Sequence, residues 1–363
     1  MHIAEIIKGK GLFPPKRLTV AITTNCNLRC EHCWVECDGA AGQGTNAPTD
    51  GIKRLIREFV DIGGEEISLT GGEPLMHPDS LEILSFCQSM NLMSIQLQTN
   101  ATLLTPQFFK SLSAVDTQKL NFQVSLDGAT AATHDLVRGQ GSFKKAVSGI
   151  AQLNTHGYGH KTILGFTEMQ HNLNEVPVLL KLAAQTGVAS VIGWSLAQHG
   201  KALYTESVAP PLPEQYVQML ELYHSDQEFR DLYEQYGRFA AIEWFKGRDQ
   251  PSTHSCRFIE KPYVSAAGTL YPCVLLQEDA YAAFDLYHRS LDEAIQEKID
   301  DWSTLRAESI KRSKELECFK GCTGAQHCAG GCFARATVVA GSRRGVEDRC
   351  RLRRAVYEWH PQV

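Results

Sequence analysis

The sequence has 363 residues, more than one hydrophobic core usually serves, so we expect more than one domain. Hydrophobic residues make up 43% and charged residues 21% of the chain, a composition that excludes wholesale disorder. The net charge of -5 makes the chain as a whole a poor ligand for a nucleic-acid backbone. It also lacks a secretory signal and an apolar run of the roughly 18 residues that a membrane span needs. We therefore predict a cytoplasmic protein without a nucleic-acid or membrane partner.

Strands and helices are expected to alternate over the first 200 residues. The apolar patterns predict strands at 17–24, 65–70, 94–100, 119–128, 162–168 and 189–197, and helices at 49–60, 78–90, 105–113, 142–156 and 173–186. Such alternation indicates a parallel sheet whose functional groups lie at the carboxyl ends of the strands. Six units do not fill an eight-unit barrel. We therefore predict an α/β fold with a partial (β/α)6 barrel over residues 1–202.

The pattern changes after residue 208. A proline-rich stretch leads into aromatic-rich helix without a strand signal, which we interpret as a helical linker region over residues 203–250. From Cys256 onward the sequence is rich in glycine and cysteine and shows little periodicity. Residues 251–363 are therefore expected to form a small, irregular, cysteine-rich domain.

The 12 cysteines gather in two segments. Four lie within residues 26–37 and seven within the last 108 residues, which leaves Cys87 on a predicted amphipathic helix as a small buried hydrophobe. The cytosol is reducing, so clustered thiols in a large unexported chain indicate metal binding rather than disulfides.

The first cysteine motif follows the first predicted strand. Cys26, Cys30 and Cys33 have the spacing C-x3-C-x2-C, and three thiolates so close can bind one face of an iron–sulfur cluster. Zinc in structural sites prefers four ligands, so a zinc knuckle is the less favoured alternative. Cys37 could offer a fourth thiolate, or a reversed triad with Cys30 and Cys33.

This motif, followed by Gly71-Gly72-Glu73-Pro74 after the second strand, resembles the radical S-adenosylmethionine (SAM) superfamily. The resemblance implies that Cys26, Cys30 and Cys33 hold a [4Fe–4S] cluster whose fourth iron is chelated by the amino and carboxylate groups of SAM. The family often has an aromatic residue just before the third cysteine, where this chain has His32.

The resemblance also implies SAM contacts at eight positions. Gly71, Gly72 and Glu73 match the motif that receives the SAM amino group, because glycines let backbone carbonyls approach closely and a carboxylate suits an ammonium. Polar positions that contact the methionine or ribose part of SAM in relatives match Gln98, Asn100, Ser125, Asp127 and Arg138. Ordinary loop and cap chemistry is the alternative for each of these residues.

Seven further cysteines resemble the SPASM extension, the auxiliary-cluster domain of peptide-modifying radical SAM enzymes. The middle group departs by one residue from the usual spacing, with three residues between Cys318 and Cys322. The resemblance implies two auxiliary [4Fe–4S] clusters and thus three in all. One would be held by Cys318, Cys322, Cys328 and Cys350, and the other by Cys256, Cys273 and Cys332. Zinc sites are the rival interpretation.

Some relatives carry a fourth cysteine ligand a few residues before the position that matches Cys256. Residues 246–255 of this chain hold no cysteine, so the cluster assigned to Cys256, Cys273 and Cys332 lacks that ligand. Its fourth iron would bind His254 or Asp249, or stay open to water or to a substrate thiolate. The sequence leaves a closed and an open site equally favoured.

Reductive cleavage of SAM to a 5′-deoxyadenosyl radical is the activity that the resemblance implies. The radical would abstract a hydrogen from a substrate, in the first place a peptide or protein side chain, whereas a haem intermediate or another small cofactor precursor is the alternative. Val274 stands where sulfatase-maturing relatives carry aspartate, which argues against that activity. The catalytic acid or base stays unassigned.

The expected partners include a flavodoxin- or ferredoxin-type electron donor. Because only about 16 residues precede the first strand, we expect either a separate leader-binding protein or a substrate without a leader. A weaker alternative is a non-enzymatic zinc or iron–sulfur protein that uses its basic C-terminal segment. Residues 303–354 hold 12 Lys and Arg against 5 Asp and Glu. We interpret this local excess as compensation for anionic metal centres rather than as a nucleic-acid surface.

Overall fold

The computed structural model describes residues 2–35, 44–250, 256–316, 318 and 320–361. The chain forms two compact units. Unit 1 contains Met1–Arg29, Val35–Gln123 and Arg257–Glu308, and unit 2 contains Cys30–Trp34, Val124–Cys256 and Ser309–Val363. Each unit is assembled from separate segments, so the domain boundaries near residues 202 and 250 stay a prediction.

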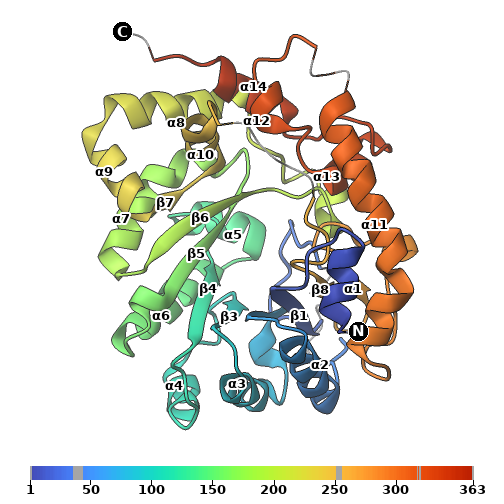
Figure 1. Cartoon of the computed structure of the whole chain (residues 1–363). Coiled ribbons are helices and arrows are strands. Elements are labelled where there is room, and N and C mark those ends of the chain that lie inside the picture. Colours follow the sequence, from blue (N-terminus) through green and yellow to red (C-terminus); the bar gives the residue numbers. More distant parts are fainter. Residues whose placement is uncertain (1, 36–43, 251–255, 317, 319, 362–363) are drawn as a thin grey trace. The chain divides into compact units, whose positions relative to one another are not determined.

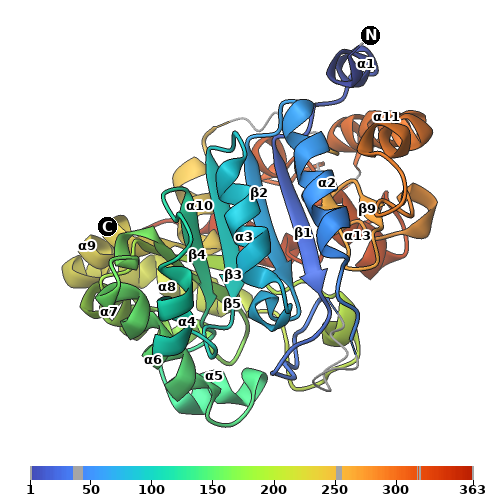
Figure 2. The same ribbon diagram turned by 90° about the horizontal axis from the view of Figure 1, so that it is seen from below.

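Unit 1 is built on a mostly parallel sheet in the order β9-β8-β1-β2-β3. Only the pair β8–β9 is antiparallel. Helices α2 and α3 lie on the same face of this sheet (Figure 2). The strands are β1 (Arg17–Thr23), β2 (Glu66–Gly71), β3 (Ser94–Thr99), β8 (Tyr263–Val264) and β9 (Leu270–Tyr271). The helices are α1 (Ile3–Gly9), α2 (Thr49–Asp61), α3 (Ser80–Ser89) and α4 (Pro106–Leu112), with short 3-10 turns η1 (Pro74–Met76) and η5 (Asp279–Tyr281).

The chain passes from unit 1 to unit 2 within β4 (Leu120–Ser125) and again within α11 (Leu291–Glu315). In unit 2 the parallel strands β5 (Thr162–Glu168), β6 (Ser190–Ser195) and β7 (Gly237–Arg238) are neighbours in that order. Helix α14 packs against α8 and α10 (Figure 1). The helices are α5 (Ala131–Arg138), α6 (Ser142–Thr155), α7 (Val176–Thr186), α8 (Pro213–Ser225), α9 (Gln227–Tyr236), α10 (Ala240–Gly247), α12 (Ala325–Cys328), α13 (Phe333–Ala340) and α14 (Cys350–Glu358), with turns η2 (Gly159–Lys161), η3 (Leu173–Glu175) and η4 (Gly200–Leu203).

The predicted α/β class with parallel strands is confirmed, and all six expected strands are present. Helix α2 shows why the pattern was readable. Its predicted apolar face, Ile52, Leu55, Ile56 and Phe59, is at most 1% exposed, because these side chains repeat every three or four residues.

Several elements were not predicted, among them α5, β7 and α11. The expectation of little regular structure after Cys256 is wrong for α11, which has 25 residues. Its buried side chains recur at Leu291, Ile295, Ile299 and Trp302, but acidic and basic residues dilute this stripe. Helix α5 buries only two side chains, and β7 has two residues, too few for an alternating pattern. None of the helices in the described part of the chain has both the length and the apolar character required to span a bilayer.

Candidate functional site

The Gly71-Gly72 turn at the end of β2 is pressed against the backbone that follows β1. Gly71 has φ +136°, and a Cβ added there would lie 2.1 Å from the carbonyl oxygen of Thr23. A Cβ on Gly72 would lie 2.2 Å from the carbonyl oxygen of Asn25. The amides of Gly72 and Glu73 donate to these same two oxygens at 2.7 and 2.8 Å. Only glycine permits this approach, which fixes the turn beside the start of the Cys26 loop.

Glu73 is fully buried and joins this turn to the end of β3. Its Oε1 accepts hydrogen bonds from Thr99 Oγ1 at 2.8 Å and from the Leu75 amide at 3.2 Å, and its Oε2 accepts one from the Asn100 amide at 2.8 Å. The carboxylate therefore orients the turn from inside unit 1. The contact of Glu73 with the SAM amino group stays a prediction.

The other predicted SAM residues of unit 1 lie at the carboxyl end of β3. Asn100 Nδ2 donates to Asn27 Oδ1 at 2.9 Å, which ties this strand end to the loop of Cys26. Gln98 Nε2 donates to Ser68 Oγ at 2.9 Å. Cys26 itself is 7% exposed, and its Sγ accepts a hydrogen bond from the Leu28 amide at 3.5 Å.

In unit 2 the predicted residues Asp127 and Arg138 bond to each other. Arg138 Nε donates to Asp127 Oδ2 at 2.5 Å, and His32 Nε2 lies 3.1 Å from the same oxygen. Burial alone would raise the pKa of Asp127, but Arg138 and His32 together hold it well below its usual value. The carboxylate is therefore ionised. Ser125, the last residue of β4, is partly exposed.

Arg138 also faces the second cysteine of the N-terminal motif. Its Nη1 lies 3.8 Å from Cys30 Sγ, within the range of a weak N–H···S hydrogen bond. A guanidinium beside a thiol favours the thiolate, which is the form that binds iron. This contact gives Asp127 and Arg138 a position beside a predicted cluster ligand, while their contacts with SAM stay predictions.

The loop of Cys33 depends on a glycine that the sequence analysis missed. Gly200 has φ +58°, and a Cβ there would lie 2.7 Å from the Cys33 carbonyl oxygen. That oxygen accepts a hydrogen bond from the Lys201 amide at 2.9 Å. Turn η4 therefore supports the cysteine loop from the end of β6. No motif marks this glycine, because it lies 167 positions after Cys33 in the chain.

Six of the seven C-terminal cysteines lie in unit 2, where they form two sets. Burial raises the pKa of the Cys350 thiol, and the nearby thiols of Cys318, Cys328 and Cys322 raise it further. These are the four cysteines assigned to one auxiliary cluster, and their mutual proximity fits that cluster.

Cys256 forms the second set with Cys332. Burial and then the Cys332 thiol raise the pKa of Cys256 to about 11. Both cysteines line a cavity of about 250 Å³, which Cys328 also reaches. Cys273, the third predicted ligand, belongs to unit 1, where its carbonyl oxygen accepts a hydrogen bond from the Leu276 amide at 3.2 Å.

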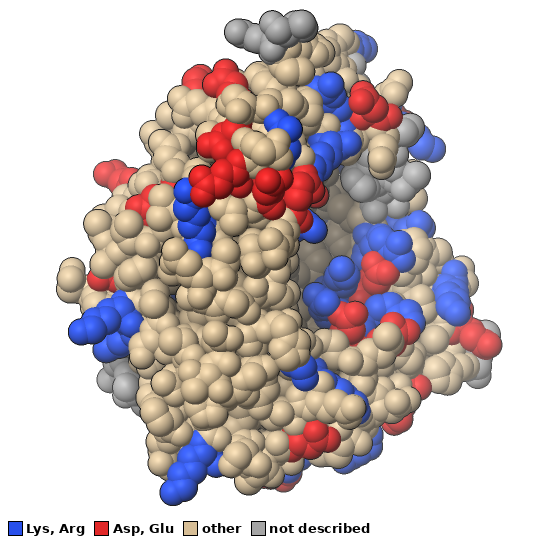
Figure 3. Space-filling view, turned by 90° about the vertical axis from the view of Figure 1, so that its left-hand side faces the viewer, with Lys and Arg blue, Asp and Glu red and all other residues tan. Residues whose placement is uncertain are grey.

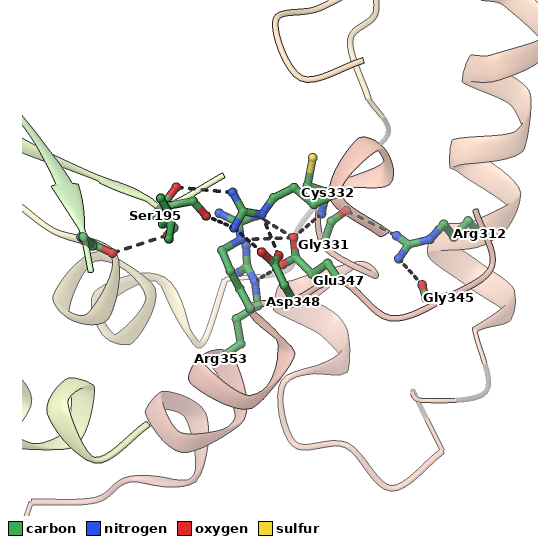
Figure 4. A network of polar contacts seen from close by, with 12 residues as sticks. Ser195, Arg312, Gly331, Cys332, Gly345, Glu347, Asp348 and Arg353 are labelled. Carbon is green, nitrogen blue, oxygen red and sulfur yellow. Dashed lines mark hydrogen bonds and ion pairs between the residues drawn. The ribbon is translucent and has the colours of Figure 1, made fainter. Parts of the chain in front are cut away.

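A network of arginines and carboxylates surrounds Cys332 (Figure 4). Glu347 is buried, and its Oε2 accepts a hydrogen bond from the Cys332 amide at 2.8 Å. Arg349 and Arg353 pair with the Glu347 carboxylate at 2.7 and 2.8 Å. Arg335, in the first turn of α13, pairs with Asp348 at 2.5 Å. These charges fix the segment that carries Cys332.

The structure describes Asp249 but not the other two candidates for an additional cluster ligand, His254 and Cys37. The Asp249 side chain is 93% exposed and does not line the cavity of Cys256 and Cys332. His254 and Cys37 lie outside the described residues. Cys87 is fully buried, as predicted, and burial raises its pKa to about 12.

No group of three or more His, Cys, Asp or Glu side chains is arranged around one metal ion in the part of the chain that the structure describes. The ligands of a [4Fe–4S] cluster bind different iron atoms and stand further apart than the ligands of one ion.

Residues 20–181 match the family model described as the Radical SAM superfamily. This stretch includes the three N-terminal cysteines, the Gly71-Gly72-Glu73 turn and the five other predicted SAM positions. Residues 20–181 therefore form a domain of the radical SAM superfamily, and the resemblance read from the motifs is confirmed. The chain is a radical SAM enzyme that binds SAM and an iron–sulfur cluster.

Two curated relatives represent different substrate classes. The AdoMet-dependent heme synthase of Methanosarcina barkeri is 28% identical over 359 residues, which cover 93% of this chain and 96% of that protein. The mycofactocin maturase MftC of Mycobacterium tuberculosis is 30% identical over 213 residues, which cover 58% of this chain and 52% of that protein. The second similarity thus spans about half of the relative.

Two solved structures share the fold. Streptococcus suis SuiB bound to S-adenosylmethionine has a TM-score of 0.69 and 15% identity, with 96% of this chain and 79% of that chain covered. The enzyme anSMEcpe with bound AdoMet has a TM-score of 0.72 and 18% identity, with 95% and 93% covered. The likeness therefore extends over the C-terminal cysteine region as well as the family-model segment.

Proposed function

We propose that this radical SAM enzyme oxidises a peptide or protein side chain by hydrogen abstraction. When bound, the cluster and SAM supply a 5′-deoxyadenosyl radical that takes hydrogen from a C–H bond. The observation that carries the proposal is the pairing of a radical SAM motif with the two C-terminal thiol sets. SuiB, which shares the fold, has been solved bound to its precursor peptide SuiA, and MftC is named as a maturase.

The residues of the N-terminal motif have separate roles in this proposal. Cys26, Cys30 and Cys33 hold the cluster, and the Gly71-Gly72 turn with Glu73 receives the SAM amino group. The buried carboxylate of Glu73 supports this role by fixing the turn, since three donors already orient it. Gln98, Asn100, Ser125, Asp127 and Arg138 are proposed to hold the methionine and ribose parts of SAM.

The two C-terminal sets are proposed to hold auxiliary [4Fe–4S] clusters. The proximity of Cys318, Cys322, Cys328 and Cys350 supports a fully ligated cluster. Cys256 and Cys332 beside their cavity support a second cluster, with Cys273 as the further ligand. Such clusters accept the electron that a substrate radical loses when it is oxidised, or they bind the substrate directly.

A tetrapyrrole substrate is the second candidate, because the similarity to the M. barkeri heme synthase runs over nearly the whole of both chains. In that case the hydrogen would come from a C–H bond of a haem intermediate. In both cases we propose a cytoplasmic enzyme reduced by a flavodoxin- or ferredoxin-type donor, because exposed clusters need a reducing compartment. A separate leader-binding protein is proposed only for the peptide substrate.

The test is made on anaerobic, reconstituted enzyme with SAM and dithionite. We expect about twelve irons per chain and formation of 5′-deoxyadenosine. Replacing Cys26, Cys30 and Cys33 with alanine should remove about a third of the iron and abolish SAM cleavage, whereas Cys87→Ala, the matched control, should change neither. SAM cleavage by the triple variant would refute the assignment.

The substrate class is tested with two probes. One is a synthetic peptide encoded by an open reading frame next to the gene, and the other is iron coproporphyrin III. Each is incubated with SAM, and its mass is measured for loss of hydrogen or of carbon dioxide with hydrogen. Oxidation of the peptide alone supports the first candidate, and oxidation of the porphyrin alone replaces it with the second.

A further inference from the structure

Arg312 is a buried arginine near the end of α11 that the motifs do not identify. It is 6% exposed. Its Nη2 donates to the Gly345 carbonyl oxygen at 2.8 Å and its Nη1 donates to the Gly331 carbonyl oxygen at 3.4 Å (Figure 4). Gly330 leaves room for it, since a Cβ there would lie 2.6 Å from Nη1. The guanidinium is thus held in one place by carbonyl groups.

This guanidinium has no carboxylate partner among the described residues. Its Nε is buried and has no hydrogen-bond acceptor in the described part of the chain. Burying an unpaired charge and an unsatisfied donor together is costly, so such a group normally faces an anion. Arg349 and Arg353 nearby differ in this respect, because both pair with Glu347.

What Arg312 faces is the thiol cavity. Arg312, Cys256 and Cys332 all line the cavity of about 250 Å³. Cys328, which belongs to the other predicted cluster, lines the same cavity. One guanidinium therefore faces cysteines of both thiol sets.

We propose that Arg312 is the counter-charge of the auxiliary clusters and raises their reduction potentials, an inference that rests on the proposed function. A thiolate-ligated cluster is anionic and becomes more negative by one charge when it takes up one electron. A fixed positive charge stabilises the reduced form more than the oxidised form. Nε is the donor left for a cluster sulfur, and hydrogen bonds to sulfur act in the same direction.

The experiment uses the Cys26/Cys30/Cys33 to alanine variant, so that only auxiliary clusters contribute to the spectra. Iron and sulfide are measured first. If this protein holds no clusters, the proposed function fails before Arg312 is examined. If it holds them, their potentials are titrated with dithionite under electron paramagnetic resonance, with Arg312→Met and Arg312→Lys added in turn. Arg344→Met is the matched control, because Arg344 is exposed and directly precedes Gly345, whose carbonyl oxygen Arg312 binds.

We expect Arg312→Met to lower the ratio of reduced to oxidised auxiliary cluster at a fixed potential at least tenfold, a shift of about 59 mV for one electron. Arg312→Lys should leave the reduction potential of the auxiliary clusters close to that of the parent variant, because it keeps the positive charge. Arg344→Met should leave that potential unchanged. If Arg312→Met fails to load iron, restored loading in Arg312→Lys supports the proposal. Full loading of Arg312→Met with an unchanged potential overturns it, and so does equal loss of iron in both Arg312 variants.

Discussion

The most informative single change at the SAM site is Glu73→Gln, which keeps the shape of the side chain and removes its charge. The carboxylate accepts from three donors, of which the Thr99 hydroxyl and the Asn100 amide are buried and the Leu75 amide is partly buried. A glutamine side chain keeps only one of the two oxygens as an acceptor. If its nitrogen takes the place of Oε1, the Thr99 hydroxyl can turn to accept, but the Leu75 amide loses its partner. If its nitrogen takes the place of Oε2, the Asn100 amide loses its partner. Either way one backbone N–H beside this side chain is left unsatisfied, which costs about 1–3 kcal/mol.

The unsatisfied N–H can regain an acceptor only if the Gly71-Gly72 turn moves. A displaced turn presents its carbonyls wrongly to the SAM ammonium, so the same 1–3 kcal/mol corresponds to roughly 5- to 150-fold in affinity. We expect SAM to bind Glu73→Gln about tenfold or more weakly, in an anaerobic titration, with iron content unchanged. Glu82→Gln is the control, because the Glu82 side chain is 57% exposed. A dissociation constant within twofold of that of the unsubstituted enzyme would refute the reasoning.

Two further predictions concern unit 2. Gly200→Ala should lower the iron content of the N-terminal cluster, because its Cβ would clash with the Cys33 carbonyl oxygen at a cost of about 1–3 kcal/mol. Gly341→Ala is the control, because Gly341 has a similar φ of +60° but no atom within 4 Å of the added Cβ. It should leave the iron content unchanged. His134 has its pKa lowered to about 4, by burial first and then by Arg138. The unfolded chain therefore binds more protons between pH 6.5 and pH 4, and the free energy of unfolding should fall by about 2 kcal/mol from pH 7 to pH 5. His134→Asn keeps an acceptor for the Asp127 amide and should lose this pH dependence in denaturant titrations, so an undiminished dependence would contradict the assignment.

The strands were predictable because buried parallel strands appear as short apolar runs. Val20, Ala21 and Ile22 are fully buried in β1, and the cysteine motif follows directly. Helix α5 was missed because its buried residues are only His134 and Val137. Its signals are caps instead. Thr130 accepts from the Thr133 amide at the start, and Gly139 with φ +100° ends the helix.

The sequence predicted which residues belong to the candidate site but not which of them contact each other. The family motifs named Asp127 and Arg138 separately, each as a contact of SAM. Their ion pair joins positions 11 residues apart. The place of His32 beside Asp127 depends on a fold that brings together positions 95 residues apart. Side-chain pairing across such distances leaves no periodic trace in one sequence. The same holds for Glu347 and the Cys332 amide, which no motif connects.

Ion pairs inside unit 2 explain part of the excess of basic residues within positions 303–354. Arg335 binds the Ser195 and Leu196 carbonyls as well as Asp348, so its charge is used inside unit 2. Arg353 pairs with a buried carboxylate and stacks over Trp244 at 4.0 Å. On the face in Figure 3, basic and acidic side chains are intermixed rather than gathered in one basic field. Buried arginines are costly unless anions lie nearby. Asp348 and Glu347 supply them for Arg335 and Arg353, and the thiol sets would supply them for Arg312. These pairs agree with the preferred interpretation, compensation of buried negative charge, while the absence of a nucleic-acid partner stays a prediction.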